Sequence, residues 1–134
     1  MFLTSVEITY ICTMTVTADS EKEYIRKYLL ALQGLMGFSP RELDVAVLMV
    51  YRYKMLVRLQ SKLKNKKAKE DFDPFQELKM PEVLGAITKE LNMSFGVFKN
   101  YIRGLKAKGF FDVGSINSIC VPEDGQTTIT FKHV

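Results

Sequence analysis

Residues Ile87–Phe111 read ITKELNMSFGVFKNYIRGLKAKGFF, and this segment carries the strongest structural signal in the chain. It predicts two short helices joined by a tight turn. Ile87 and Leu91 lie four residues apart, on one face of the first helix, and Met93 closes the turn. Ser94 is a favourable N-cap for the second helix, because its hydroxyl can accept a hydrogen bond from a backbone N–H of the next turn.

The second helix is predicted over Phe95–Lys108. Phe98, Ile102 and Leu105 recur in it at helical spacing and form an inward stripe. Gly109 follows at a position where a helix ends in the left-handed conformation, which glycine adopts without strain. One helix is therefore presented on the surface with a second braced behind it, as in proteins that insert a helix into the DNA major groove.

This pattern resembles the winged helix-turn-helix domains of bacterial and phage DNA-binding proteins. Thr88 and Val97 depart from the family pattern, in which alanine and threonine are usual. The residues that carry the resemblance are Ile87, Leu91, Met93, Ser94, Phe98, Ile102, Leu105, Gly109 and Phe111. The resemblance implies an α+β fold, mainly helical, with an extra N-terminal strand and helix and a C-terminal β-hairpin wing.

Two segments are expected on this basis: an N-terminal strand–helix extension over 1–37 and the winged domain over 38–134. In the extension, apolar residues alternate with polar ones from Val6 to Thr17, interrupted only at Ile11, which is typical of a half-buried strand. A capping box that starts at Ser20 predicts the start of a helix, and Gly34 and Gly37 predict its end.

A second capping box, Ser39-Pro40-Arg41-Glu42, predicts the start of a central helix that is apolar nearly all round from Val45 to Tyr51. This helix is expected to end near Asn65. A basic and then acidic insertion follows around 62–80, with a loop over Lys66–Asp73. The wing is expected as two strands, 111–121 and 126–134, around a turn at 122–125.

The net charge of +4 is unevenly distributed. Arg52–Lys69 holds eight basic residues and no acidic one, which is the pattern expected of a phosphate-binding surface. The alternative is that these lysines solvate the exposed end of a long helix.

Candidate nucleic-acid-binding residues follow from the predicted recognition helix and this basic segment. Asn100 can read adenine and Arg103 can read guanine through paired hydrogen bonds, whereas lysines mostly contact phosphate. Phe95 can touch a thymine methyl group or cover the turn. The candidates are Ser94, Phe95, Lys99, Asn100, Arg103 and Lys106 in the helix, and Lys62, Lys64, Lys66 and Lys67 in the basic segment. The same residues also fit the ordinary polar face of an amphipathic helix or a protein contact.

Catalytic chemistry has little support in the sequence. The chain has a single histidine, His133, so a histidine-based triad or histidine metal cluster is not expected. Asp71 and Asp73 are expected to be solvated or to cap helices. Cys12 and Cys120 match no metal or redox spacing and are expected to be buried, reduced thiols. We therefore expect a protein that is not an enzyme and has no metal and no cofactor.

The leading hypothesis is a double-stranded DNA-binding protein that acts in transcription or replication control. It would reside in the cytoplasm of a bacterium or phage-infected cell. The longest apolar run, Val45–Tyr51, is too short to span a bilayer, and no signal peptide is expected. The alternative is a structural subunit, such as a ring or connector protein of a phage virion. Its long threonine-rich N-terminal strand would add to a neighbour's sheet and form a homo-oligomer or bind assembly partners.

Overall fold

The computed structural model describes the backbone of residues 6–12, 18–123 and 127–133, and the side chains of residues 21–123. The fold is α+β and mainly helical, as expected. It contains two small antiparallel sheets of two strands each.

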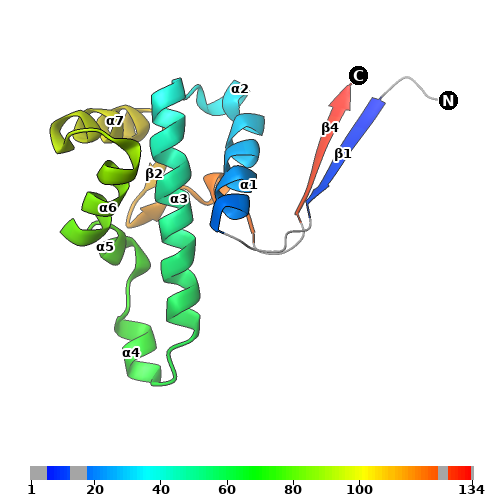
Figure 1. Ribbon diagram of the computed structural model, residues 1–134. Helices are drawn as coiled ribbons and strands as arrows, with labels where there is room; N and C mark the ends of the chain where they lie inside the picture. The colour runs from blue at the N-terminus through cyan, green and yellow to red at the C-terminus, as the bar shows by residue number, and fades with distance from the viewer. Residues whose placement is uncertain (1–5, 13–17, 124–126, 134) are drawn as a thin grey trace.

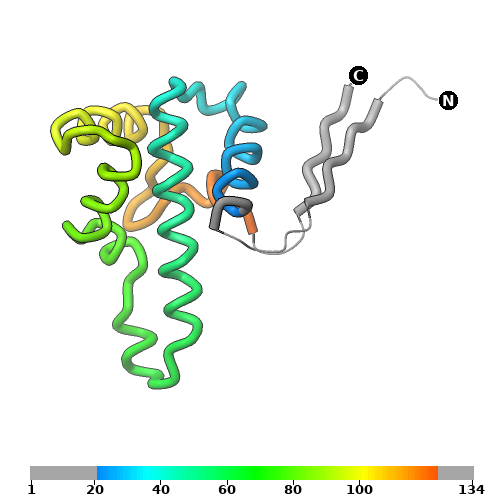
Figure 2. The backbone as a smooth tube through the Cα atoms, in the orientation of Figure 1, coloured from blue at the N-terminus to red at the C-terminus, as the bar shows by residue number. Residues whose placement is uncertain are grey.

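Helix α3 (Pro40–Ser61) is the central element of the fold. Helices α1 (Ala18–Ala31) and α2 (Gln33–Met36) lie on one side of it. On the other side lie α4 (Lys66–Asp71), α5 (Pro74–Leu78), α6 (Pro81–Leu91) and α7 (Phe95–Ala107), as Figure 1 shows. The smooth trace in Figure 2 shows α3 running the whole length of the helical body.

The start of α3 confirms the second capping box. The Ser39 hydroxyl accepts a hydrogen bond from the Glu42 backbone N–H, and the Glu42 carboxylate accepts one from the Ser39 backbone N–H, with Pro40 at the first helical position. All residues of the apolar run Val45–Tyr51 are buried. The helix is buried on every side there because α1 covers one side, and α5, α6 and α7 cover the other.

The α6–α7 pair forms the predicted helix–turn–helix segment, and α7 ends at Ala107, one residue before its predicted end at Lys108. Asn92 adopts the left-handed conformation, with φ of 52°, and ends α6. The Ser94 hydroxyl then accepts a hydrogen bond from the Val97 backbone N–H, 3.2 Å away, and caps α7. Gly109 follows α7 with φ of 84°, which only glycine adopts readily. Ile87, Phe98 and Leu105 are buried, as predicted, whereas Ile102 of the same inward stripe is only partly buried.

The predicted C-terminal hairpin is wrong in its pairing. A short hairpin forms instead between β2 (Phe111–Asp112) and β3 (Ser115–Ile116), because Gly114 turns the chain back with φ of 72°. Strand β4 (Thr127–His133) pairs in antiparallel fashion with β1 (Val6–Cys12), from Val6 opposite His133 to Cys12 opposite Thr127. Alternation within one segment does not identify its partner strand, which explains the error.

The predicted loop over Lys66–Asp73 is also wrong. Asn65, which was expected at the end of the central helix, is the N-cap of α4, and α3 ends at Ser61. Asp73 caps α5 by accepting hydrogen bonds from the backbone N–H groups of Phe75 and Gln76. Phe75 and Leu78 are buried, so the insertion contributes to the core.

The N-terminal segment differs in detail from its prediction. Helix α1 begins at Ala18, two residues before the expected cap at Ser20, and positions 13–17 of the expected strand lie outside the described residues. The single helix expected here is two helices: α1 ends at Ala31, Gly34 lies inside α2, and Gly37 ends α2 in the left-handed conformation. Ile25 and Leu29 of α1 belong to the same hydrophobic core as α3, so the helix of the expected extension packs into the same body.

Candidate nucleic-acid interface

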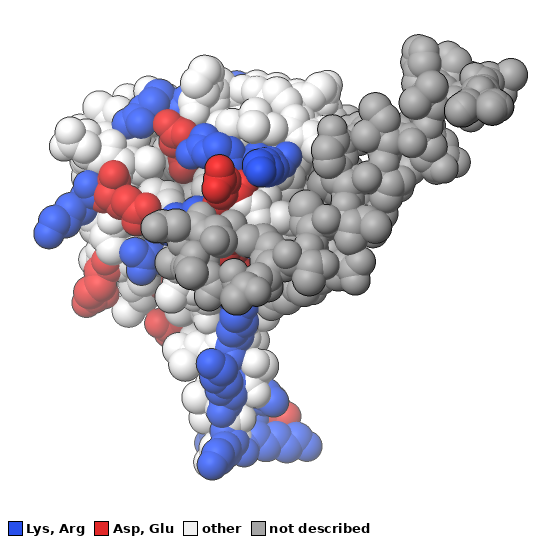
Figure 3. All heavy atoms as spheres, turned by 45° about the vertical axis from the view of Figure 1, so that its right-hand side comes forward, with Lys and Arg blue, Asp and Glu red and all other residues white. Residues whose placement is uncertain are grey.

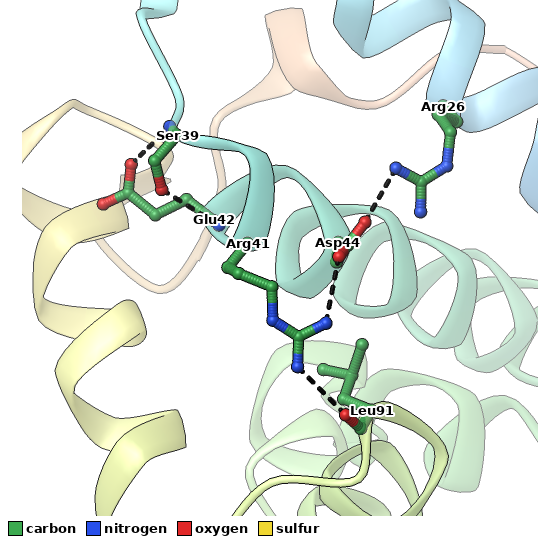
Figure 4. Close-up of polar contacts among 6 residues, drawn as sticks. All are labelled: Arg26, Ser39, Arg41, Glu42, Asp44 and Leu91. Atoms are coloured by element: carbon green, nitrogen blue, oxygen red, sulfur yellow. Dashed lines mark hydrogen bonds and ion pairs between the residues drawn. The ribbon is translucent and has the colours of Figure 1, made fainter.

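The first turn of α3 holds the ends of both helices of the α6–α7 pair. Arg41 donates a hydrogen bond from Nη2 to the Leu91 carbonyl oxygen at the end of α6, over 3.0 Å. Its Nη1 lies 3.1 Å from the Asp44 carboxylate, which also forms an ion pair of 2.8 Å with Arg26 of α1 (Figure 4). This network links α1, α3 and α6 and fixes the entrance to the turn before α7.

The neighbouring residue, Glu42, holds the other end of the pair. Lys108, the C-cap of α7, donates a hydrogen bond from Nζ to Glu42 Oε1. Burial by itself raises the pKa of the Glu42 carboxyl. The hydrogen bonds from Lys108 and from the Ser39 backbone oppose that effect and leave the pKa below its ordinary value. Glu42 therefore stays ionised and ties α7 to the start of α3.

Helix α7 presents a cationic exposed face. Lys99, Asn100, Arg103 and Lys106 are all exposed, and the helix contains no acidic residue. Phe95, in the first turn, is 51% exposed; its ring stacks on Phe98 with 6.2 Å between centroids. The Lys99 ammonium lies 5.5 Å from the Phe95 ring centroid. The structure thus places Phe95, Lys99, Asn100, Arg103 and Lys106 together on one helix, while the Ser94 hydroxyl caps that helix.

The candidate lysines of the basic segment form a second group. These residues lie on the projection made by the end of α3 and by α4, where Lys and Arg side chains gather in Figure 3. We call this group the lysine projection; its members are Lys62, Lys64, Lys66, Lys67 and Lys69, and all of them are exposed. Within residues 21–123, no carboxylate forms an ion pair with any of them.

The first half of the basic segment has a different role. Lys54 is 5% exposed, and Arg58 forms an ion pair with the buried carboxylate of Glu21 in α1. The ion pair of Arg58 belongs to the α1–α3 contact, and Lys54 is buried, so neither cation is free to meet a phosphate backbone. The first exposed cation of the segment is Lys62.

The two candidate groups lie at opposite ends of α3. Helix α7 contacts the Glu42 end through Lys108, whereas the lysine projection starts where α3 ends at Ser61. At roughly 1.5 Å per helical residue, these ends are on the order of 30 Å apart. The candidate residues therefore form two separate patches.

An apolar groove beside α7 was not predicted from the sequence. Its walls come from α7, from α5 and from β2, and it has a volume of about 600 Å³. Phe75 and Phe111, which line it, lie in segments that were expected to be insertion and wing. Their aromatic side chains were the feature of the sequence that could have indicated an apolar groove. Lys79, the C-cap of α5, also lines it and was not among the candidate residues.

Other kinds of site find little support in the described part of the chain. No group of three or more His, Cys, Asp or Glu residues there could hold a metal ion. Cys120 is a free, buried thiol, as expected; the side chain of Cys12 lies outside the described residues. Within the described ranges, each helix is too short or too polar to cross a membrane.

Comparison with protein-family models, with curated proteins and with solved structures gives no match for this chain.

Proposed function

We propose that this chain is a winged helix-turn-helix protein that binds double-stranded DNA. In this assignment α6 and α7 are the helix-turn-helix, and the β2–β3 hairpin is a short wing. The observation that carries the proposal is the exposed surface of α7, which presents Lys99, Asn100, Arg103 and Lys106 and contains no acidic residue. A phosphate backbone is attracted to such a face, whereas acidic residues would repel it.

Two kinds of contact are proposed for α7. Asn100 and Arg103 meet base edges in the major groove, because their side chains can form paired hydrogen bonds with adenine and guanine. Lys99 and Lys106 meet phosphates and fix the register of the helix without reading sequence. The bond from Arg41 to Leu91 and the bond from Lys108 to Glu42 support this role by holding α6 and α7 in one orientation.

The lysine projection is proposed to contact the backbone of the same duplex, away from the base pairs that α7 meets. Its lysines carry positive charge without the aromatic or amide groups that read bases, so the contact would add affinity for every sequence. We propose that the protein acts through binding, without catalysis, in transcription or replication control in the cytoplasm, where a bacterial or phage genome is read.

The experiment that tests the proposal is a salt series. A fluorescently labelled duplex is titrated with the protein at increasing salt, and the logarithm of the binding constant is plotted against the logarithm of salt concentration. Each phosphate contact releases counterions, so the slope is expected to be about −0.9 per contact. If the protein does not bind the duplex at low salt, the proposed DNA-binding function is wrong.

A second candidate function rests on the β1–β4 pair. It is a two-stranded sheet, so each strand keeps one edge on which no described strand pairs. Open edges accept strands from neighbouring chains, and isolated two-stranded sheets have little stability of their own. We propose as the alternative a structural subunit, for example of a phage virion, that forms a homo-oligomer through this sheet. A discrete high-order assembly in mass measurements, without DNA affinity, would favour it.

A further inference from the structure

The groove beside α7 has a continuous apolar floor. Phe98 and Ile102 of α7, Phe75 of α5 and Phe111 of β2 line it, with Met49 of α3 beneath. The rings of Phe75 and Phe111 meet edge to face, with 6.1 Å between their centroids. Phe95 lines one end while 51% exposed. A floor of this kind offers large apolar side chains a place to be buried.

The rim of the groove is positively charged on both walls. Lys99, Arg103 and Lys106 follow one side of α7 at spacings of four and three residues, so they form a stripe along the helix. Lys79 stands on the opposite wall, with its ammonium 4.9 Å from the Phe75 ring centroid. Asp112 is the one acidic residue among the described residues that line the groove.

We propose that this groove docks an acidic amphipathic helix of a partner protein. The apolar face of that helix would carry large side chains against the phenylalanine floor, and its flanks would carry Asp or Glu against the cations. The line from Phe95 to Lys106 extends roughly 17 Å along α7, enough for about three turns of a partner helix. Helices bind apolar grooves with this periodicity of anchor residues, and complementary charges on the rim select the partner.

Charge and shape together favour an acidic helix over duplex DNA in the groove. DNA would satisfy the cations, but its sugar–phosphate surface has no large apolar group to cover the phenylalanine floor. The proposed acidic helix would pair with the cations and would also cover the phenylalanine floor. Phe95, Lys99, Arg103 and Lys106 line the groove and are also candidate DNA contacts, whereas Asn100 and the lysine projection do not line it, so the partner helix and DNA would share part of the α7 surface.

A direct binding measurement tests the inference without any DNA. The probe is a fluorescein-labelled synthetic helix of roughly four turns, with Leu and Phe on one face and Glu on both flanks. It is titrated with the full chain and followed by fluorescence anisotropy. The control peptide has Gln in place of every Glu. We expect the Glu peptide to bind and the Gln peptide to bind at least about tenfold more weakly.

Three variants locate the site. Lys79→Glu reverses a rim charge that is not among the proposed DNA contacts, and Phe95→Ala removes part of the apolar lining. Lys89→Glu makes the same charge change at an exposed position of α6 that does not line the groove. All three positions are exposed, and thermal melts would check that each variant is folded.

We expect Lys79→Glu and Phe95→Ala each to weaken peptide binding by about fivefold to tenfold, and Lys89→Glu to change it by less than about twofold. The inference is overturned by any of three results: the Glu peptide does not bind, the Gln peptide binds equally well, or the first two variants match Lys89→Glu. Since DNA is absent from every arm, none of these results bears on whether the protein binds DNA.

Discussion

Gly104 of α7 lies so close to Glu42 of α3 that a Cβ atom at position 104 would overlap the Glu42 carboxylate, and would stand 3.3 Å from its Cδ. The carboxylate cannot move away freely, because it accepts hydrogen bonds from Ser39 and Lys108. Glycine within a helix ordinarily costs about 1 kcal/mol relative to alanine. At position 104 the missing side chain makes room for the group that joins α7 to α3.

We predict that Gly104→Ala destabilises the fold. The added methyl group would displace the Glu42 carboxylate, and hydrogen bonds to a charged group are worth about 1.5–3 kcal/mol. The gain in helix propensity offsets part of this, so a net loss of about 0.5–2 kcal/mol is expected. Urea unfolding monitored by circular dichroism measures it.

Gly96 is the matched control for this prediction. It lies in the same helix, and a Cβ there would meet nothing within 4 Å. Gly96→Ala should therefore stabilise the protein by up to about 1 kcal/mol. In a Glu42→Ala background, Gly104→Ala should also become stabilising. If it stays equally destabilising there, the carboxylate is not the cause.

Glu42 should also make stability depend on pH. Its pKa is lower in the folded protein than the ordinary value of 4.5, so its ionised form favours folding. That contribution is complete above the ordinary pKa and is lost as the pH falls through the lower, folded value. We predict that Glu42→Gln costs about 1–3 kcal/mol at pH 7 and much less at an acidic pH below the folded pKa.

Unfolding curves of the wild type and of Glu42→Gln at both pH values would show this convergence. A constant difference between the two proteins would mean that the ion pair with Lys108 does not contribute to stability.

The local features of the helices were predictable from the sequence because short-range chemistry determines them. Ser39 and Ser94 cap helices in the structure, and Gly109 has the expected left-handed conformation. Asp73 caps α5, one of the two roles expected for it, but the same reasoning missed Asn65 as a cap, since the helix that it starts is too short to show a periodic apolar pattern. Pairing partners depend on contacts far apart in sequence, so the β1–β4 pairing could not be predicted.

The candidate site was predictable in composition but not in arrangement. The exposure of Lys99, Asn100 and Arg103 follows from helical periodicity around Phe98 and Leu105. The division into two patches follows from the length of α3, which the sequence pattern overestimated. The sequence could not show that Arg58 is outside the exposed basic surface, because its ion-pair partner Glu21 lies in a different helix.

We predict that Leu105→Ala is strongly destabilising. Leu105 is fully buried, so its truncation leaves a cavity that the packed helices fill only in part. A loss of about 2–5 kcal/mol in unfolding free energy is expected. A change below about 0.5 kcal/mol in denaturant unfolding would mean that α7 presents a different face to the core.

Cys120 should react with thiol reagents only after unfolding. Burial raises the pKa of its thiol to about 11, so very little reactive thiolate is present at neutral pH. Alkylation by iodoacetamide, mapped by mass spectrometry of the peptide that contains Cys120, should be slow in the native protein and rapid in urea. Equal rates in both states would contradict the buried position.

The most direct test of DNA binding compares two variants on two duplexes. Arg103→Ala removes a proposed base contact; the second variant replaces Lys62, Lys64, Lys66 and Lys67 with Gln. Lys27→Gln, at an exposed position on α1, is a charge control. The preferred duplex is selected from a random-sequence library, and a random duplex serves as the reference for sequence-independent binding.

Binding isotherms of the wild type and each variant are measured on both duplexes at several salt concentrations. We predict that Arg103→Ala costs about 1–3 kcal/mol on the preferred duplex and less on the random one. The four-lysine variant should weaken binding to both alike and flatten the salt dependence, and Lys27→Gln should have little effect. If Arg103→Ala and the four-lysine variant both leave every isotherm unchanged, α7 is not a recognition helix and the proposed DNA-binding function is wrong.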